Sequence, residues 1–193
     1  MIDERSAEPP KDRQERILDA VLELLAERGI SGVSMRSVAR EAGVAVGLMN
    51  YHYTDKTGLI RAALLRIGEQ DVELVRGDPE RSPEDRLRDV LRRVVEPHFL
   101  TTRYLALRLQ LWSLAQVHEE YAEINAAAQQ RYRSALAELI RAARPDLTAA
   151  DCAERADDID VVQNGIWLTA LLGLDEASLS RSVARCEDIA LRR

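Results

Sequence analysis

The residue types that most often perform catalysis or bind metals are sparse in this sequence, and their spacing suits neither task. The three histidines, His52, His98 and His118, have no nucleophile or metal-ligating partner at a useful spacing. The two cysteines, Cys152 and Cys186, form no metal-type motif and read as ordinary helix residues, so they hint only faintly at a redox sensor. We therefore expect no catalytic residue, no metal and no cofactor. A helical enzyme that assembles its site from distant residues remains an alternative.

Lys56 offers a different chemistry, the binding of an anion. It is expected in the first turn of a helix that Thr54 or Asp55 caps, where a cation is unfavourable because of the helix dipole. A phosphate docked at this helix end would satisfy both the lysine and the free backbone N–H groups. The alternative is a solvated surface lysine.

Charge is unevenly divided along the chain, which matters for a phosphate partner. Residues 1–67 hold 10 Lys and Arg and 10 Asp and Glu, whereas residues 68–193 hold 17 and 23 and supply the whole net charge of −6. Phosphate contacts provide most of the non-specific affinity for nucleic acid, so an acidic protein needs its cations on one face. The neutral first third leaves nucleic acid open as a partner.

The overall composition is that of a globular protein. The 193 residues suit one compact unit or a small domain joined to a larger one, with 46% hydrophobic and 31% charged residues. The polar start with Pro9 and Pro10 does not resemble a signal peptide, and no apolar run approaches the roughly 20 residues that span a membrane. Two cysteines make no disulfide scaffold and suit a reducing compartment, so we expect a cytoplasmic protein.

Hydrophobic periodicity predicts an all-α fold of nine helices without strands. The first helix has an apolar face that starts at Ile17, and it ends near Gly29, where a left-handed residue is expected. Glycine, proline and capping residues place the other helices at about 35–42, 45–51, 55–75, 83–97, 102–117, 119–143, 148–173 and 175–191. We expect two domains, residues 1–54 and residues 55–193.

The spacing within the first 52 residues fits a helix-turn-helix. Ala39 is small where the second helix must approach the third, Gly43 allows a positive φ in the turn, and Val44 fills the space between the helices. Such a unit binds DNA in many proteins, but a plain structural hairpin has the same needs. Spacing alone leaves both interpretations open.

The same segment resembles the TetR family of one-component transcriptional regulators. The matching residues run from Gly29 to Val44 and continue into the expected fourth helix, through Gly47, Met49, Tyr51, His52, Tyr53, Lys56 and Leu59. Two positions depart from the family, which usually has Ser or Thr at Ala45 and often Tyr at Asn50. The rest of the chain looks like the family's ligand-binding and dimerisation domain. Residues 112–115 and 164–168 are similar to the branch that includes the choline-responsive betaine repressor.

The resemblance implies a DNA-binding surface on the second and third helices and the start of the fourth. Ser34 is expected on phosphate and Arg36 on a base edge. The start of the recognition helix, residues 45–48, has no hydrogen-bonding side chain, so it is expected to meet thymine methyl groups. Lys11 and Arg13, which lie ahead of the first expected helix, could form a basic arm that reaches an adjacent groove of the DNA. A solvated surface position explains them equally well. The candidate DNA contacts are Ser34, Met35, Arg36, Ala45, Val46, Gly47, Leu48, Tyr51, His52 and Lys56.

The C-terminal part is expected to provide a dimer interface. One short recognition helix reads too few bases, so helix-turn-helix regulators usually dimerise on palindromic DNA. Small residues four apart suggest a close seam between the last two helices of two chains, although they also suit close packing within one chain. The candidate interface residues are Gly165, Thr169, Leu172, Gly173, Leu179 and Val183.

Aromatic residues with amide neighbours are the candidates for an effector pocket. Six of the eight aromatic residues lie in the middle helices, and most are expected in the core. A mostly apolar pocket with a few polar anchors favours Gln110, Trp112, Gln116, Asn164 and Trp167. An aromatic cage for a quaternary ammonium ion is conceivable, but the sequence places no carboxylate with the rings.

Together these features predict a homodimeric repressor that a small molecule releases from a palindromic operator. The ligand would favour a conformer in which the fourth helix holds the two DNA-binding domains of the dimer at a distance that does not match the operator half-sites. One alternative is a DNA-binding regulator controlled by a protein partner or by abundance alone, which a closed core without a pocket would favour. A small helical enzyme is the other, and turnover of a candidate ligand would support it.

Overall fold

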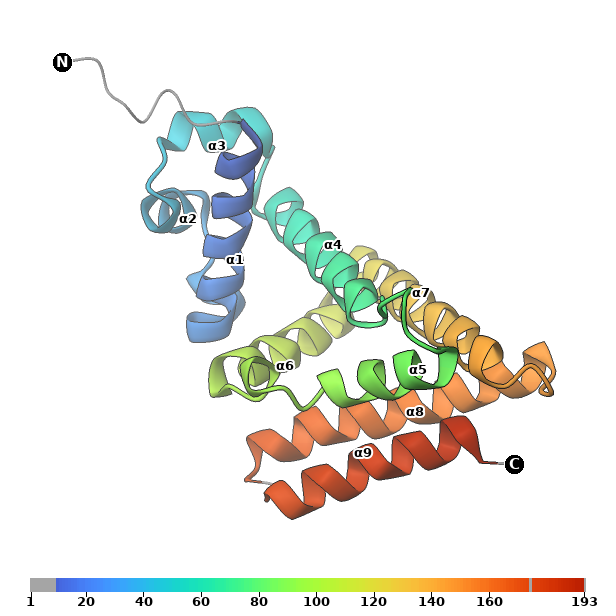
Figure 1. Cartoon of the computed structure of the whole chain (residues 1–193). Coiled ribbons are helices and arrows are strands. Elements are labelled where there is room, and N and C mark those ends of the chain that lie inside the picture. Colours follow the sequence, from blue (N-terminus) through green and yellow to red (C-terminus); the bar gives the residue numbers. More distant parts are fainter. Residues whose placement is uncertain (1–9, 174, 193) are drawn as a thin grey trace. The chain divides into compact units, whose positions relative to one another are not determined.

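The computed structural model describes residues 10–173 and 175–192, and all regular structure within these residues is helical (Figure 1). The helices follow one another as α1 (Pro10–Gly32), α2 (Met35–Ala42), α3 (Val46–His52), α4 (Lys56–Leu74), α5 (Pro83–Arg93), the 3₁₀ turn η2 (Pro97–Phe99), α6 (Thr102–Val117), α7 (Glu119–Ala143), α8 (Ala149–Leu171) and α9 (Glu176–Leu191). For this described part of the chain, the prediction of an all-α fold with nine helices is confirmed. None of the described helices is both long and apolar enough to cross a membrane.

Side-chain caps start most helices where the sequence predicts. Ser34 and Ser37 form a reciprocal capping box at α2, with Ser37 N donating to Ser34 Oγ at 3.0 Å and Ser34 N donating to Ser37 Oγ at 2.8 Å. Asp55 caps α4, because Gly58 N donates to Asp55 Oδ1 at 2.8 Å. The caps of α5, α6, α8 and α9 are Ser82, Thr101, Thr148 and Asp175.

Two helix ends differ from the sequence prediction. α1 does break its helical geometry at Gly29, which has φ 62°, but a last turn continues to Gly32. α5 ends at Arg93 rather than near Pro97. Proline lacks an N–H, and in a helix its ring would clash with the carbonyl four residues earlier, which is that of Arg93. Pro97 opens the short turn η2 instead.

The chain divides into two compact units, residues 1–66 and 67–193. The first unit contains α1, α2, α3 and the first part of α4. It extends past residue 54 because Leu59 and Ile60 of α4 are buried and Arg66 returns to α1. Arg66 donates to the carbonyl of Glu15 at 2.9 Å and pairs with Asp19 at 2.7 Å.

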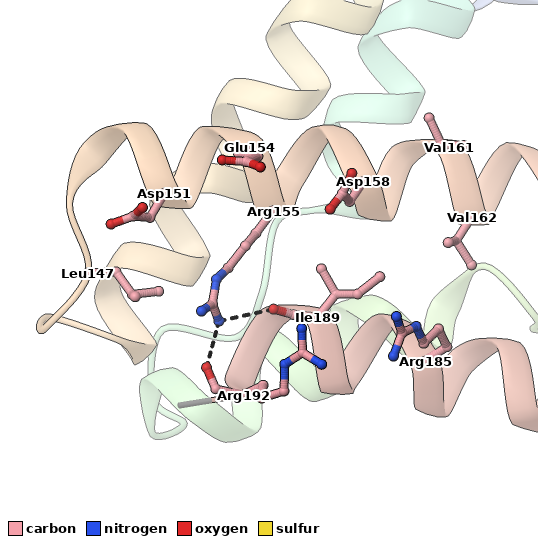
Figure 2. A pocket seen from close by; sticks show the side chains of 10 residues that line it. All are labelled: Leu147, Asp151, Glu154, Arg155, Asp158, Val161, Val162, Arg185, Ile189 and Arg192. Carbon is pink, nitrogen blue, oxygen red and sulfur yellow. Dashed lines mark hydrogen bonds between the residues drawn. The ribbon is translucent and has the colours of Figure 1, made fainter.

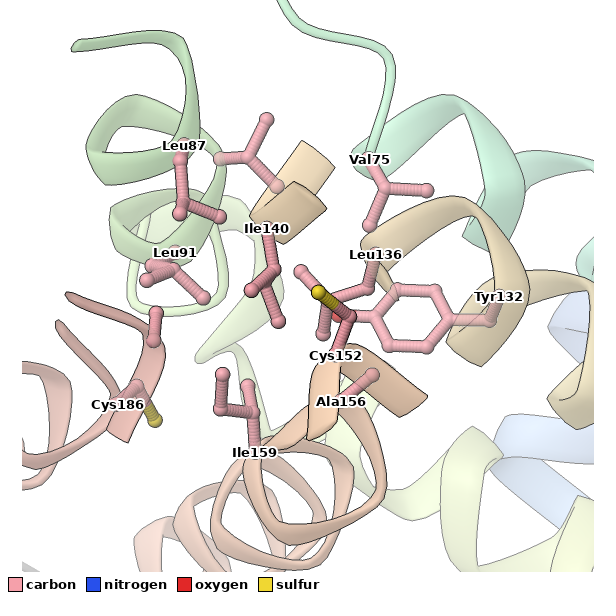
Figure 3. Close-up of a cluster of buried hydrophobic side chains, with 12 residues drawn as sticks. Val75, Leu87, Leu91, Tyr132, Leu136, Ile140, Cys152, Ala156, Ile159 and Cys186 are labelled. Atoms are coloured by element: carbon pink, nitrogen blue, oxygen red, sulfur yellow. The ribbon is translucent and has the colours of Figure 1, made fainter. Parts of the chain in front are cut away.

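The second unit is a bundle of α5 to α9 with the last part of α4. Its main core cluster joins α5, α7, α8 and α9 through side chains such as Leu91, Ile140 and Ile159 (Figure 3). Cys152 and Cys186 are buried in the same cluster as free thiols. Burial raises the pKa of Cys186 to about 12, which keeps this thiol protonated and unreactive at neutral pH.

Candidate DNA interface and effector site

The turn between α2 and α3 has the geometry that a helix-turn-helix requires. Gly43 adopts φ 64° and ψ 35°, in the left-handed region. The amide of Val44 donates to the carbonyl of Ala39 at 2.9 Å, and Ala39 is buried. Met49 and Tyr53 anchor α3 from its buried side. The remaining faces of α2 and α3 are therefore presented outward on a fixed frame.

α2 presents two arginines on one face. Arg36 and Arg40 are four residues apart, so they lie one turn above the other, and both are exposed. Neither has a hydrogen-bond or ion-pair partner among the described residues. Arg36 was a sequence-based candidate, whereas Arg40 was missed, although its spacing from Arg36 was a usable signal. The two side chains form a row of positive charge along the exposed face of α2.

Ser34 is committed in part to capping α2. Its Oγ accepts from Ser37 N and lies 2.9 Å from Ser37 Oγ, which itself lies 2.8 Å from the carbonyl oxygen of Gly32. When Ser37 donates to Gly32, the hydrogen between the two hydroxyl groups comes from Ser34, so Ser34 donates to Ser37 Oγ. Ser34 is exposed, and its hydroxyl could donate to a phosphate oxygen instead by turning away from Ser37. Met35, between the capping serine and Arg36, is only partly exposed.

The front of α3 is apolar and open. Ala45 is the N-cap without a side-chain hydrogen bond, in keeping with its departure from the family's Ser or Thr. Ala45 and Gly47 are exposed, Val46 is 40% exposed and Leu48 is partly buried. A Cβ added at Gly47 would meet no atom within 4 Å. Nothing inside the chain therefore requires glycine at this position.

Replacing Gly47 by alanine is expected to stabilise the chain slightly and to weaken DNA binding. Alanine is the better helix former by up to about 1 kcal/mol. An added methyl group facing the groove should cost about tenfold in affinity, or ~1.4 kcal/mol. Thermal unfolding and DNA titration check the two effects. Gly58→Ala is the matched control, because its Cβ would lie 3.7 Å from Asp55 Oδ1 and away from α3. Unchanged DNA affinity of Gly47→Ala would contradict a close approach by α3.

The end of α3 carries two exposed rings. Tyr51 is 83% exposed, and its ring centroid lies 5.2 Å from that of His52, edge to face. A tyrosine this exposed has little role in the folding of its own chain, and its hydroxyl can donate to a phosphate. Both rings follow the apolar front of α3 by one turn or more, where backbone contacts would flank base contacts.

The ammonium group of Lys56 already makes one hydrogen bond within the chain, which the sequence did not indicate. Its Nζ donates to the carbonyl of Ile30 at 2.6 Å, which ties the start of α4 to the end of α1. An ammonium group has three N–H donors, so two remain for a phosphate. The side chain of Lys11 lies outside the described residues. Arg13 is partly buried and already has an interaction within the chain.

The second unit contains a buried ion pair that sequence reasoning missed. Arg108 of α6 is 4% exposed, and its Nη1 donates to both carboxylate oxygens of Asp71 in α4, at 2.8 and 2.7 Å. Burial alone would lower the pKa of Arg108, but the Asp71 carboxylate holds it above its ordinary value. Arg108 Nε is buried without a hydrogen-bond partner in the described part of the chain.

Aromatic rings surround this ion pair. The Arg108 guanidinium carbon lies 4.6 Å from the centroid of Trp167, over the ring face. Tyr104 packs edge to face against Trp167 at 5.9 Å and against Phe99 at 5.2 Å. Trp167 is buried, and its Nε1 donates to the carbonyl of Val94 at 3.0 Å. Burial raises the pKa of Tyr104 to about 12.

The other predicted effector residues are placed differently. Trp112 has no ring contact with Trp167 among the described residues, and both it and Gln110 are partly buried. Gln116 is exposed. The Nδ2 of Asn164 donates to Asp160 Oδ1 at 3.1 Å on the same helix. The structure therefore joins Trp167 to Arg108 and Tyr104 rather than to the amides that were predicted with it.

A cavity of about 460 Å³ opens beside the buried ion pair. Asp71 and Tyr104 form part of its wall, and Arg108 lies behind them. Its lining from α4, the end of α5, η2 and α6 comprises Ile67, Gln70, Asp71, Glu73, Leu74, Arg93, Glu96, His98, Phe99 and Tyr104. The volume lies within the range of small-molecule sites, and the wall combines apolar rings with a few charged groups. None of the five predicted effector residues lines it.

A second polar group is buried on the α7 and α8 side of the bundle. The hydroxyl of Tyr132 donates to Gln163 Oε1, and Gln163 Nε2 has no partner among the described residues. Burial raises the pKa of the Asp160 carboxyl and that of the Tyr132 hydroxyl. The contacts of α4 with α6 and of α7 with α8 therefore each include a pair of buried polar side chains.

The outer face of α8 and α9 combines an apolar stripe with opposite charges. Val161, Leu168 and Leu172 are 71%, 43% and 78% exposed. A groove of about 660 Å³ lies between the two helices. Its lining includes Glu154 and Asp158 on α8 and Arg185 and Arg192 on the side of α9 (Figure 2).

The predicted interface residues fall into two groups. Thr169, Leu172 and Gly173 are exposed, and a Cβ at Gly165 would meet nothing within 4 Å. Val183 is buried in a core cluster of its own chain, and Leu179 packs partly buried against that cluster. The two α9 side chains therefore pack within their own chain, whereas the residues at the end of α8 are exposed.

A helix-turn-helix with two exposed arginines on α2 and an apolar start of α3, followed by a larger helical unit with its own cavity, is the organisation expected of a DNA-binding transcriptional regulator. Residues 17–63 match the family of bacterial regulatory proteins called the tetR family, and residues 83–192 match the C-terminal domain of BetI-type transcriptional repressors. The chain belongs to the TetR family. This family is one of regulators, not of enzymes.

A curated relative agrees with this assignment, and solved structures share the fold. The chain is 25% identical over 161 residues, 83% of each chain, to the HTH-type transcriptional regulator BetI of Escherichia coli K12. A crystal structure from Pseudomonas aeruginosa PAO1 has a TM-score of 0.82 at 24% identity, covering 97% of this chain and 92% of that one. A Saccharomonospora viridis protein solved in complex with choline has a TM-score of 0.70 at 20% identity, covering 95% and 97%.

Proposed function

We propose that this protein is a homodimeric repressor that binds a palindromic operator and is released from it by a small molecule. The observation that supports this most strongly is the outward surface of α2 and α3. There α2 carries the exposed Arg36 and Arg40, which have no partner among the described residues, and the next helix, α3, begins with exposed apolar residues. Arginine can read guanine in the major groove, and the apolar residues suit thymine methyl groups. The protein would act in the cytoplasm, where bacterial DNA lies.

The dimer would form on the exposed face of α8. Val161, Gly165, Leu168 and Leu172 are spaced by four, three and four residues, which makes one apolar seam along the helix. An isologous interface places the same patch of both chains together. The acidic start of this face on α8 can then lie against arginines on α9 of the second chain.

Replacing Leu172 by lysine should weaken self-association at least about tenfold, or ~1.4 kcal/mol, because it places a charge in this seam. Lysine is compatible with a helix C-terminus, so the fold should tolerate it. Sedimentation equilibrium of the variant measures the effect. Val117→Lys is the matched control, since Val117 is also exposed at a helix C-terminus, that of α6. Equal self-association of Leu172→Lys and wild type would exclude this face.

The effector would bind in the cavity between α4, α5, η2 and α6. Its wall contains Asp71 of α4, the helix that continues from the DNA-binding unit into the effector-binding unit. A ligand there would have to bind the two conformations of α4 with different affinity to change DNA binding. The choline complex of the Saccharomonospora viridis protein supports small-molecule binding in this fold.

The effector proposal is tested by release of the protein from DNA. The probe is the duplex that binds best in selection from a randomised library, and the candidates are choline and a panel of small metabolites. Gln70→Trp, which fills the cavity from an exposed position, should keep DNA affinity and lose the response to any active compound. A response that Gln70→Trp retains would exclude the cavity. No active compound would favour control by a protein partner.

A further inference from the structure

The buried ion pair has the composition of a binding site for an organic cation. Such sites surround the cation with aromatic faces and often add a carboxylate. Here Trp167 supplies a ring face, Tyr104 stands edge-on to that ring at 5.9 Å, and Asp71 supplies the carboxylate. The sequence did not reveal this grouping because the three residues lie on three different helices.

The cation in this site is part of the chain itself. The guanidinium of Arg108 lies 4.6 Å over Trp167 while its Nη1 holds both oxygens of Asp71. The side chains of Arg108 and Asp71 are only 5% and 12% exposed. Arg108 thus occupies both the ring face and the carboxylate that a free cation would need.

We infer that Arg108 is a specificity-determining residue that closes this site to quaternary ammonium ions. A quaternary ammonium has no N–H, so it cannot replace the charge-assisted hydrogen bonds from Arg108 to Asp71. Displacing Arg108 would also leave a guanidinium buried without its counter-charge, which is strongly unfavourable. Choline is therefore not the ligand of this cage. Only the relevance of this inference for regulation rests on the proposed function, because choline binding to this site can be measured without DNA.

The test is calorimetric titration of the full-length protein with choline chloride, with sodium chloride as the salt control. Wild type should show no saturable binding. Arg108→Met replaces the guanidinium with an uncharged side chain that is shorter but still apolar enough to pack. The variant should therefore bind choline with a dissociation constant in the millimolar range, an affinity at least tenfold higher than that of wild type. Trp167→Leu in the Arg108→Met background is the matched control and should lose that gain.

Folding of Arg108→Met provides a second readout, because the variant leaves Asp71 buried without a counter-charge. Choline should raise its thermal midpoint, while sodium chloride at equal concentration should not. If the variant does not fold even with choline, the double variant Asp71→Asn with Arg108→Met removes the lone charge. It is titrated in a Trp112→Phe background, in which Trp167 is the only tryptophan and its fluorescence should respond to choline.

Three outcomes would overturn the inference: saturable choline binding by wild type, a folded Arg108→Met that gains none, or a double variant whose Trp167 does not respond. Each differs from failure of the proposed function. Choline binding by wild type would strengthen the case for an effector while excluding the closed cage. A regulator that no compound releases from DNA would lose its proposed control while the cage result stands.

Discussion

Replacing Asp71 by asparagine is expected to lower the free energy of unfolding by roughly 3–5 kcal/mol. The change keeps the shape of the side chain but leaves Arg108 buried at 4% exposure without its counter-charge. The amide can accept one hydrogen bond from Nη1, yet it cannot compensate the charge. Urea unfolding at neutral pH, monitored through the tryptophans, measures the loss.

Two further variants show whether the loss comes from burial of an unpaired charge. Glu73→Gln removes one member of the exposed Arg76–Glu73 pair, whose side chains are 74% and 55% exposed, and should change stability by less than about 1 kcal/mol. Asp71→Leu combined with Arg108→Met removes both buried charges and should recover most of the stability. An Asp71→Asn protein as stable as wild type would show that the pair is solvated in solution.

Replacing Arg36 by alanine is expected to cost about 1–3 kcal/mol of binding free energy at one base position and to relax the preference there. Arg36 is exposed near the start of α2 and has no partner among the described residues, so the variant should fold as wild type does. Affinities for a set of duplexes, each altered at one position of the preferred site, measure the effect. Thermal unfolding confirms that the fold is unchanged.

Arg40→Ala is the comparison for Arg36→Ala, because Arg40 has the same charge and lies one turn further along the same face. A phosphate contact weakens binding to all sequences alike and reduces the salt dependence. If Arg36→Ala weakens every duplex equally, Arg36 contacts the backbone. Base reading by α2 would then have to come from Arg40.

The DNA-binding unit was predictable because its signals are local. Gly43 with its positive φ, Ser34 as the cap of α2 and the spacing of Ala39 and Val44 all act within a few residues of one another. The hydrogen bond from Lys56 to Ile30 was not predictable in the same way. It joins residues 26 positions apart and depends on how α1 and α4 meet.

The proposed effector site was less predictable, because it depends on which faces of the helices meet. Asp71 and Arg108 are 37 positions apart, and nothing in the sequence pairs them. One signal was present, since an arginine in the middle of an otherwise apolar stretch of α6 must find a buried counter-charge. That reasoning identifies Arg108 but not its partner. The sequence also does not fix the rotation of α6, which turns Tyr104 towards Trp167.

The most direct test is selection of bound sequences from a randomised duplex library at near-physiological salt. It shows whether this protein reads DNA as a dimer with two DNA-binding units. A homodimer with two such DNA-binding units should select a palindromic motif with half-sites about one helical turn, or a multiple of it, apart. Each half-site should include a position that Arg36→Ala relaxes. Loose, salt-sensitive binding without an enriched motif would contradict this expectation, because the arginines of α2 and the apolar front of α3 would then hold DNA without specifying its sequence.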